Sequence, residues 1–395
     1  MDSPNTPTRL LWGSPLPPIR SGISDYALDL LPVLARSATV RVLCPPDWSP
    51  PLDWPDELDL VAADADGLSG EIAVIHMGNN PHHLWLLPRL RREEPTVVVL
   101  HDAVLHHLLV ESTVALGDQA EYSRALKAAH GAAGTALAAA RAAGVHGHLD
   151  PFLFPARKAF LSSVDGIVVH SEWAEELVRR EFPGIAVGRV GLPVADPGKT
   201  DRAGARARLG LRSDDVVLMH LGFLTPEKGL TEILTGVAAA VRTGLPVRLV
   251  VGGEGLVTEA LRRAAVNAGV EEALLCTGWI EDEDLPGLPA AADLGVVYRT
   301  PSAGETSAAA LRFLACGVPV AVGGSRQFLE LPEPVAPRLT PGPSAAADLA
   351  RLLARVGGEG WSDRESAARD CYESSHRPEH AAREMLAFLN TIPVP

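Results

Sequence analysis

Short runs of apolar residues alternate along most of the chain with longer stretches rich in alanine and leucine. The runs are nearly continuous in valine, isoleucine and leucine, which is typical of strands buried on both faces of a parallel sheet. The pattern predicts strands over Thr8–Trp12, Thr39–Leu43, Ile72–His76, Thr96–Leu100, Gly166–Val169, Val216–His220, Val247–Val251, Ala273–Cys276, Leu294–Tyr298 and Val318–Val322. It predicts helices over Asp25–Ala35, Tyr122–Ala143, Glu172–Glu181, Thr231–Thr243, Thr306–Cys316 and about Arg377–Asn390.

Alternating strands and helices predict an α/β fold made of doubly wound parallel sheets. The 395 residues exceed the roughly 100–200 of one domain, so we expect two Rossmann-like domains. Prolines, glycines and charges gather between Leu192 and about Ala205, and the expected domains are therefore 1–194 and 205–375. The segment 376–395 is expected to form a helix that packs back toward the first domain. Ligands of such folds bind at the carboxyl ends of the strands, here in a central cleft between the domains.

Composition narrows the class of protein. Hydrophobic residues make up 47% of the chain and charged ones 21%, as in soluble globular proteins. The net charge of −14 argues against a general nucleic-acid binder, because no basic excess exists to neutralise phosphates. The four cysteines form no CxxC pair, Met1–Trp12 lacks a secretory signal pattern, and no apolar run reaches the roughly 18 residues that span a bilayer. We expect a cytoplasmic protein without a transmembrane segment, for which peripheral membrane contact stays open.

The most informative segment for chemistry is 298–320, YRTPSAGETSAAALRFLACGVPV. After a strand, its loop carries Gly304 and Glu305, and Thr306 or Ser307 can cap the helix that follows. A helix N-terminus after a glycine-containing loop offers free N–H groups and a positive dipole end, which suit a diphosphate. A carboxylate beside that end can accept hydrogen bonds from sugar hydroxyls. An ordinary capped helix with a solvated glutamate is the competing interpretation.

Two further segments follow predicted strands of the second half. VVLMHLGFLTPEKGL, residues 216–230, leads through Gly222 to Lys228, a suitable point charge for a leaving diphosphate. Its spacing is not that of a Walker A loop, and a surface lysine is the plainer interpretation. VGGEG, residues 251–255, can form a tight turn but lacks the full GxGxxG pattern of dinucleotide sites.

Polar residues also follow strands of the first half. WGSPLPPIRSGISDY, residues 12–26, places Ser21 and Gly22 before a helix expected to begin near Asp25, as in a backbone-amide nest. VVVLHDAVLHH, residues 97–107, delivers His101 and Asp102 at the carboxyl end of a strand, where functional groups of α/β sheets gather. The nearby His106 and His107 are adjacent and lack a matching carboxylate set, so we do not expect a metal site. MGNNPHH, residues 77–83, adds polar groups after another strand.

With these residues in hand, the sequence resembles the retaining glycosyltransferases of family 4, which have the GT-B fold. The resemblance covers nearly the whole chain. The blocks SPLPP…SGISDY, GNNPHH, VVLHDAVLHH and VVHSEW look like those of a bacterial subgroup. GFLTPEKG, VGGEG and GETSAAALRFLACGVPV follow in the family's order and approximate spacing, and GETS looks like a variant of the family's E-x7-E motif.

The resemblance implies roles for individual residues. His101 would contact the transferred sugar, Lys228 would bind the donor diphosphate, and Glu305 would be the first glutamate of the E-x7-E motif. The other residues expected to bind the donor are Gly22, Gly222, Glu254, Arg299, Gly304, Thr306, Ser307 and Arg312. The residues expected on the acceptor side are Asp25, Asn79, Asp102 and His106.

Two positions depart from the family pattern. The arginine that often follows the glycine of the phosphate loop is replaced by Phe223. The second E-x7-E glutamate, which usually holds the ribose, falls on Arg312 or Phe313 depending on the register. Arg299 and Arg312 are candidates to replace the missing cation.

The resulting hypothesis is a bacterial enzyme that transfers a sugar from a nucleotide-diphosphate sugar to an acceptor hydroxyl with retention of anomeric configuration. The resemblance implies that no metal and no cofactor besides this co-substrate is needed. Donor base, donor sugar and acceptor cannot be read, and the acceptor can be a small molecule, a glycan or a glycolipid. The competing hypotheses are a catalytically silent nucleotide-sugar binder and a nicotinamide-dependent dehydrogenase, the latter opposed by the missing GxGxxG.

Overall fold

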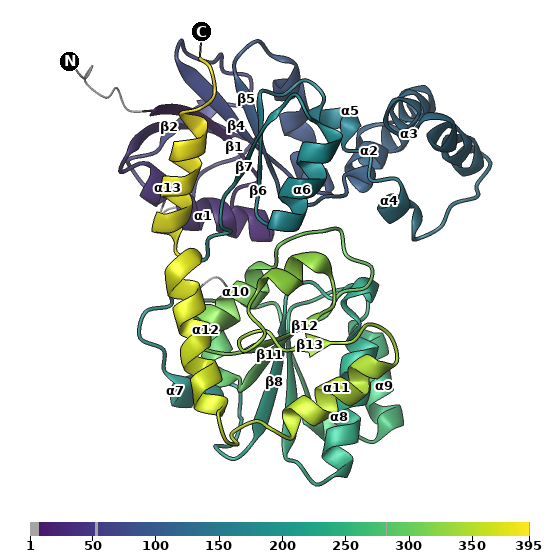
Figure 1. Cartoon of the computed structure of the whole chain (residues 1–395), viewed down its shortest axis with the longest axis vertical. Coiled ribbons are helices and arrows are strands. Elements are labelled where there is room, and N and C mark those ends of the chain that lie inside the picture. The colour runs from purple at the N-terminus through teal and green to yellow at the C-terminus, as the bar shows by residue number, and fades with distance from the viewer. Residues whose placement is uncertain (1–7, 52–53, 282, 395) are drawn as a thin grey trace. The chain divides into compact units, whose positions relative to one another are not determined.

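The computed structural model describes residues 8–51, 54–281 and 283–394. The chain divides into two compact units (Figure 1). The first comprises Met1–Pro193, Ala303–Thr306 and Pro378–Pro395, and the second comprises Val194–Ser302 and Ser307–Arg377. The first seven residues of Met1–Trp12, the stretch considered for a signal sequence, lie outside the described part.

The first unit is built on a seven-stranded parallel sheet with the order β3-β2-β1-β4-β5-β6-β7. Its strands are β1 Thr8–Gly13, β2 Ala38–Cys44, β3 Asp59–Ala62, β4 Glu71–Met77, β5 Thr96–Leu100, β6 Gly166–Val169 and β7 Ala186–Arg189. Its α-helices are α1 Gly22–Leu34, α2 His106–Ser112, α3 Gln119–Ala142, α4 Asp150–Leu153, α5 Lys158–Leu161, α6 Glu172–Glu181 and α13 Pro378–Leu389, with 3-10 turns η1 Pro81–Arg91 and η2 Val114–Leu116.

The second unit is built on a six-stranded parallel sheet with the order β10-β9-β8-β11-β12-β13. Its strands are β8 Val216–Leu221, β9 Val247–Gly252, β10 Leu274–Gly278, β11 Leu294–Val297, β12 Val320–Gly323 and β13 Arg338–Leu339. Its α-helices are α7 Arg202–Arg208, α8 Leu230–Arg242, α9 Thr258–Ala268, α10 Ala308–Ala315, α11 Ser344–Leu353 and α12 Trp361–Ser375. Its 3-10 turns are η3 Pro226–Lys228, η4 Glu271–Ala273, η5 Leu288–Ala291 and η6 Arg326–Glu330.

The predicted α/β class with two Rossmann-like parallel sheets is confirmed. Each of the ten predicted strands is present, with ends displaced by at most two residues. The strands β3, β7 and β13 were not predicted, and each lies at an edge of its sheet. Edge strands are covered less completely, so β3 and β7 have exposed residues at both ends.

Three predicted helices begin or run differently from the expectation. Helix α1 begins at Gly22 and not near Asp25, because the side chain of Ser21 accepts a hydrogen bond from the N–H of Ile23 and caps it. Helix α10 begins at Ala308, capped by the hydroxyl of Ser307, so Thr306 lies in the preceding loop. Helix α3 is kinked at Gly131, where φ is 60° and ψ is −137°.

The C-terminal helix α13 packs against α1 and β7 within the first unit. A Cβ at Gly188 of β7 would lie 2.5 Å from the ring of Phe388, so only glycine leaves room for this aromatic side chain. The carboxylate of Glu384 accepts a hydrogen bond of 2.8 Å from the N–H of Gly191, just after β7. Helix α13 therefore covers the face of the first sheet at β6 and β7.

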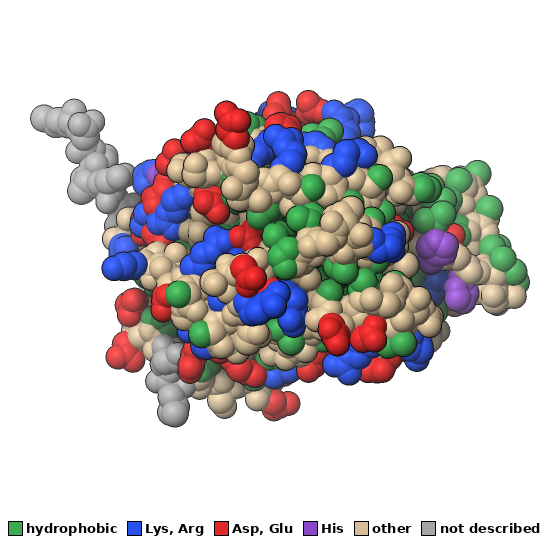
Figure 2. Space-filling view, turned by 90° about the horizontal axis from the view of Figure 1, so that it is seen from below, with side chains coloured by type: hydrophobic (Ala, Val, Ile, Leu, Met, Phe, Trp, Pro, Cys, Tyr) green, Lys and Arg blue, Asp and Glu red, His purple; other side chains and the backbone are tan. Residues whose placement is uncertain are grey.

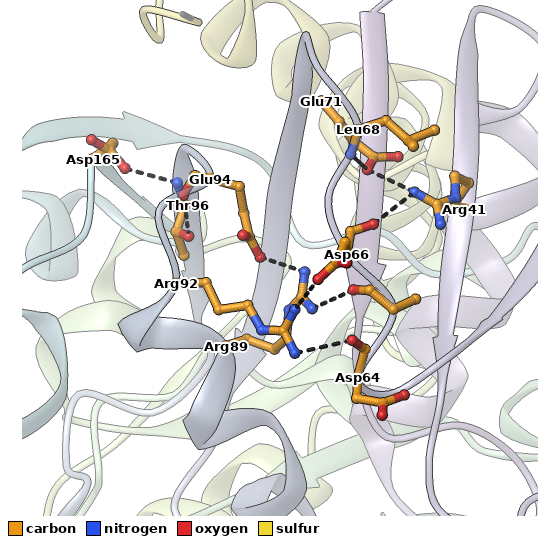
Figure 3. Close-up of polar contacts among 11 residues, drawn as sticks. Arg41, Asp64, Asp66, Leu68, Glu71, Arg89, Arg92, Glu94, Thr96 and Asp165 are labelled. Carbon is orange, nitrogen blue, oxygen red and sulfur yellow. Dashed lines mark hydrogen bonds and ion pairs between the residues drawn. The ribbon is translucent and has the colours of Figure 1, made fainter.

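Buried charges gather at the amino ends of strands β4 and β5 (Figure 3). Glu71, the first residue of β4, accepts hydrogen bonds from Arg41 at 3.0 Å and from the N–H of Leu68 at 2.9 Å. Arg89, which is 1% exposed, bonds to the carbonyl of Ala65 at 2.7 Å and pairs with Glu94. These residues hold the loops at the edge of the sheet opposite to the carboxyl ends of the strands.

The surface of the first unit exposes large apolar side chains around α3 and α4, the lobe at the right of Figures 1 and 2. Val145, Leu149 and Leu153 are 66%, 45% and 68% exposed. On the rest of the face in Figure 2, acidic and basic side chains are interspersed. No helix among the described residues is long and apolar enough to cross a membrane.

Candidate functional site

Each sheet has one point at which the strand order reverses direction. In the first sheet it lies between β1 and β4, and in the second between β8 and β11. Connections leave such a point on opposite faces of the sheet, which opens a crevice at the carboxyl ends of the two strands.

In the first unit, His101 follows β5 directly and lies against His76 of β4. The Nε2 atom of His101 is 2.8 Å from Nδ1 of His76, and the two rings stack with centroids 5.1 Å apart. The rings of Tyr26 and His170 also lie beside His101, with centroids at 5.0 and 5.1 Å. Sequence reasoning identified His101 but missed the other three side chains of this cluster. The position of His76 near the end of a buried strand was the signal that could have found it.

Burial keeps the imidazoles around His101 neutral. The pKa values of His76 and His101 lie well below the usual value, first because the rings are buried and then because of neighbouring histidines. Burial likewise lowers the pKa of His83 and of His170 to about 4. Burial raises the pKa of the Tyr26 hydroxyl. The cluster therefore presents uncharged donors and acceptors at neutral pH.

Asn79 and Asp102 stabilise the loops that follow β4 and β5. The N–H of Asn79 donates to Oδ2 of Asp102 at 2.7 Å. The side-chain carbonyl of Asn79 accepts from the N–H groups of His107 at 2.8 Å and Leu108 at 3.3 Å, at the start of α2. Asp102 directly follows His101 in the chain, whereas Asn79 lies in the loop after the neighbouring strand β4, and each of the two residues has a structural task.

The structure gives His106 a structural role that conflicts with the predicted acceptor role. Its side chain is buried at 1% exposure. Its Nδ1 atom lies 2.6 Å from the carbonyl of Phe154, and its Nε2 atom lies 2.9 Å from the hydroxyl of Tyr122. Both ring nitrogens are therefore occupied within the protein, and we leave His106 out of the site.

Helix α1 provides the remaining first-unit candidates. Gly22 is its first residue, directly after the cap Ser21, and Asp25 lies in its first turn. The helix begins shortly after β1, one of the two strands at the reversal point. Its N-terminal N–H groups can bind an anion.

In the second unit, Gly222 and Lys228 meet at the end of β8, a strand at the reversal point. Gly222 has a φ of 111°, and a Cβ there would lie 2.9 Å from Nζ of Lys228. The loop after β9 approaches the same backbone, because a Cβ at Gly253 would lie 2.4 Å from the carbonyl oxygen of Gly222. Glycine at these positions allows two loops to pack backbone to backbone beside an ammonium group.

Arg299, just after β11, contributes a second cation near the same place. Burial first, and then the charges of Lys228 and Arg299, together lower the pKa of His220 of β8 to about 3. The charges of Lys228 and Arg299 therefore both influence His220, near the carboxyl ends of β8 and β11. Phe223, where an arginine was expected from the resemblance, is 46% exposed and packs against Trp279 with ring centroids 5.6 Å apart.

The other donor-site candidates lie in loops or along α10. Glu254 accepts a hydrogen bond of 3.4 Å from the N–H of Trp279. Gly304 has a φ of 79°, in the left-handed region that favours glycine, and Glu305 and Thr306 follow it in the loop. Arg312 lies in the last turn of α10, at the far end from the N-terminus that would meet a phosphate.

Among the residues that the structure describes, no group of three or more His, Cys, Asp or Glu side chains is arranged to hold a metal ion.

Parts of the chain are similar in sequence to known glycosyltransferases. Residues 215–356 match the family model described as Glycosyl transferases group 1. An alpha-monoglucosyldiacylglycerol synthase from Streptococcus pneumoniae is 26% identical over 178 residues, which cover 42% of this chain and 39% of that protein. A GDP-mannose-dependent alpha-(1-6)-phosphatidylinositol dimannoside mannosyltransferase from Mycobacterium tuberculosis is 34% identical over 118 residues, 29% of each chain. The chain thus spans about two fifths or less of the length of these relatives.

A solved structure resembles almost the whole chain. The sucrose-phosphate synthase from Thermosynechococcus elongatus superposes with a TM-score of 0.68 at 17% identity, covering 96% of this chain and 98% of that one. The fold is therefore that of GT-B glycosyltransferases, with two parallel-sheet Rossmann-like domains. The segment that matches the Glycosyl transferases group 1 model includes Gly222, Lys228 and Arg299.

Proposed function

We propose that this protein transfers a sugar from a nucleotide-diphosphate sugar to an acceptor hydroxyl, with retention of anomeric configuration and without a metal ion. The observation that carries the proposal is the position of the Lys228 ammonium against Gly222 at the reversal point of the second sheet, inside the matched family segment. The resemblance to family 4, including the GETS variant of its motif, supports the retaining outcome.

In the proposed reaction, the bond between the anomeric carbon and the diphosphate oxygen breaks while a bond to the acceptor oxygen forms on the same face of the sugar. The departing phosphate oxygen takes the proton of the acceptor hydroxyl, so no covalent enzyme intermediate is needed. Negative charge builds on the diphosphate, where Lys228, Arg299 and the N-terminus of α10 stabilise it. Positive charge builds on the sugar, beside which His101 and Glu305 orient the hydroxyls.

The acceptor is proposed only as a class. The two relatives named above act, by their names, on lipid-linked substrates. A hydroxyl-bearing glycolipid, glycan or small molecule is compatible with the roles assigned here.

The test begins with binding. Purified full-length protein is heated with UDP-, GDP-, dTDP- and ADP-sugars in the presence of EDTA, and the melting temperature is recorded. Stabilisation by one donor, reduced in Lys228→Ala and retained in Lys127→Ala, supports the donor site; Lys127 is an exposed lysine on α3. Failure of all four sugars and of free nucleoside diphosphates at millimolar concentration contradicts it.

Turnover then separates the enzyme from the silent binder. Release of nucleoside diphosphate from the selected donor is measured for the wild type and for Glu305→Gln. An enzyme loses turnover in the variant, whereas a binder has none in either protein. The silent binder is favoured by one observation, the loss of the family residues at Phe223 and Arg312.

A further inference from the structure

We propose that His76 is a positioning residue that holds His101 in the tautomer with its proton on Nδ1, so that His101 presents an N–H donor to its ligand. This inference rests on the proposed function in one respect, namely that the ligand is the transferred sugar. It concerns a buried residue to which the resemblance assigns no role.

The backbone brings the two imidazoles together. His76 is the next-to-last residue of β4, and His101 follows the last residue of β5. The strands pair in parallel, with Met77 opposite Leu100. The N–H of His101 donates to the carbonyl of Met77 at 2.9 Å, which fixes the backbone from which the His101 ring extends. Nδ1 of His76 then lies 2.8 Å from Nε2 of His101, a normal hydrogen-bond length.

Only one proton can occupy this hydrogen bond between two neutral rings. Either Nδ1–H of His76 donates to His101, or Nε2–H of His101 donates to His76. In the first case Nε2 of His76 is a lone pair, and in the second it carries a proton. His76 is 0% exposed, and its Nε2 has no hydrogen-bond partner among the described residues.

The environment of that Nε2 atom decides between the two cases. A buried N–H without an acceptor is rarer in proteins than an unsatisfied acceptor, because the bare donor pays its full desolvation cost. The nearest ring is the indole of Trp12, whose centroid is 4.1 Å from that of His76 and whose own N–H donates to the hydroxyl of Ser14. The arrangement with the proton on Nδ1 of His76 is therefore favoured, so that Nε2 of His101 accepts.

The neighbouring histidines have the same tautomer. Nδ1 of His83 lies 2.8 Å from the carbonyl of His76, and Nδ1 of His170 lies 2.9 Å from the carbonyl of Val190. A carbonyl can only accept, so both histidines carry their proton on Nδ1 and leave Nε2 as an acceptor. Burial lowers the pKa of each ring, so this distribution of protons persists at neutral pH.

The consequence for His101 is a defined donor. Its Nε2 is occupied, and its Nδ1 has no partner in the described part of the chain but is not among the buried polar atoms without a partner, so it is accessible. The Nδ1–H group can donate to a sugar hydroxyl oxygen. Because the ring is neutral, it adds no positive charge beside a sugar on which positive charge develops.

The first test needs no donor. Full-length protein with 15N-labelled histidine is examined by NMR at pH 7, where protonated and unprotonated ring nitrogens have separate shifts. His101→Gln assigns the His101 signals. We expect a protonated Nδ1 and an unprotonated Nε2 on His101. A protonated Nε2 on His101 in the wild type would overturn the proposal.

Two variants of His76 then test the cause. His76→Asn places an amide nitrogen where Nδ1 was, so it can still donate to His101, whereas His76→Leu cannot. The Nδ1–H signal of His101 should persist in the first variant and be lost or mixed in the second. Persistence in both variants would show that His76 does not set the tautomer. If His76→Leu does not fold, the spectra of the wild type and of His76→Asn still test the proposal. A protonated Nε2 on His101 in either spectrum would contradict it.

Kinetics gives the functional measurement with the selected donor. We expect kcat of His76→Leu to fall about tenfold to a hundredfold, the loss typical of removing the partner that orients a functional histidine. His76→Asn should recover most of it, and His146→Asn, which changes an exposed histidine, is the control. Equal losses in His76→Asn and His76→Leu would contradict the positioning role. A correct tautomer without any donor binding would refute the proposed function and leave the tautomer assignment standing.

Discussion

A Cβ placed on Gly222 would lie 2.9 Å from Nζ of Lys228. The glycine also has a φ of 111°, which side chains other than hydrogen rarely tolerate. Two separate features of one position therefore depend on glycine: the conformation of the loop and the place of the ammonium group.

Gly222→Ala should weaken binding of the nucleoside diphosphate because the methyl group displaces the Lys228 ammonium. Loss of one hydrogen bond to a charged group corresponds to about tenfold to a hundredfold in Kd. Isothermal titration with the selected nucleotide measures it. Gly244→Ala is the matched control, because Gly244 also has a positive φ of 88° but nothing within 4 Å of its added Cβ. An unchanged Kd in Gly222→Ala would refute the assigned place of Lys228.

Arg299 should matter more for the diphosphate than Arg312. Arg299 and Lys228 both lower the pKa of buried His220, which places them at one end of the second sheet. Arg312 lies in the last turn of α10, away from its N-terminus. Arg299→Gln should raise Kd for the nucleoside diphosphate about tenfold, the effect of one charge-assisted contact, while Arg312→Gln changes it little. The reverse order would make Arg312 the replacement cation.

The sequence predicted the buried strands because each is a nearly continuous apolar run, and burial on both faces leaves that signature. It did not predict β3 or β7, whose end residues are exposed at the sheet edges. His101 was predicted because a histidine at the carboxyl end of a strand is an unusual local signal. Its partner His76 was not, because the hydrogen bond between them joins residues 25 positions apart and depends on the register of β4 and β5.

Contacts between residues distant in the chain also explain why the expected role of His106 differs from its place in the structure. His106 looked like an acceptor-side residue from its neighbourhood in VVVLHDAVLHH. The two groups that occupy its ring, the carbonyl of Phe154 and the hydroxyl of Tyr122, come from segments 48 and 16 positions away. Helix caps were closer to prediction, since Ser307 was one of two candidates and does cap α10.

Gly188→Ala should destabilise the first unit. The added methyl group would lie 2.5 Å from the ring of Phe388, so either β7 or α13 must shift. Overpacking of this kind costs about 1–3 kcal/mol of unfolding free energy. Urea unfolding followed by intrinsic fluorescence measures it. Gly184→Ala is the control, because nothing lies within 4 Å of its added Cβ; an equal loss in both variants would show that α13 does not depend on Gly188.

The buried histidines should make the protein less stable as the pH falls. His83 and His170 have folded-state pKa values of about 4, below the 6.5 of an unperturbed histidine. Between pH 6.5 and about 4 the unfolded chain therefore binds protons that the folded chain excludes. Stability falls through that window as the pH decreases and is fully retained above it, with a slope of up to about 1.4 kcal/mol per pH unit for each histidine.

His83→Asn tests this origin of the acid sensitivity. The asparagine amide can still donate to the carbonyl of His76, which Nδ1 of His83 contacts at 2.8 Å, but it binds no proton. Urea unfolding gives the free energy of unfolding at pH 7, 6 and 5. The slope of this free energy against pH should be smaller in the variant than in the wild type, by an amount that corresponds to at most one bound proton. His146→Asn, at an exposed histidine, serves as the control. An unchanged slope in His83→Asn would mean that other groups cause the loss of stability, because this variant removes the titrating ring and keeps its hydrogen bond.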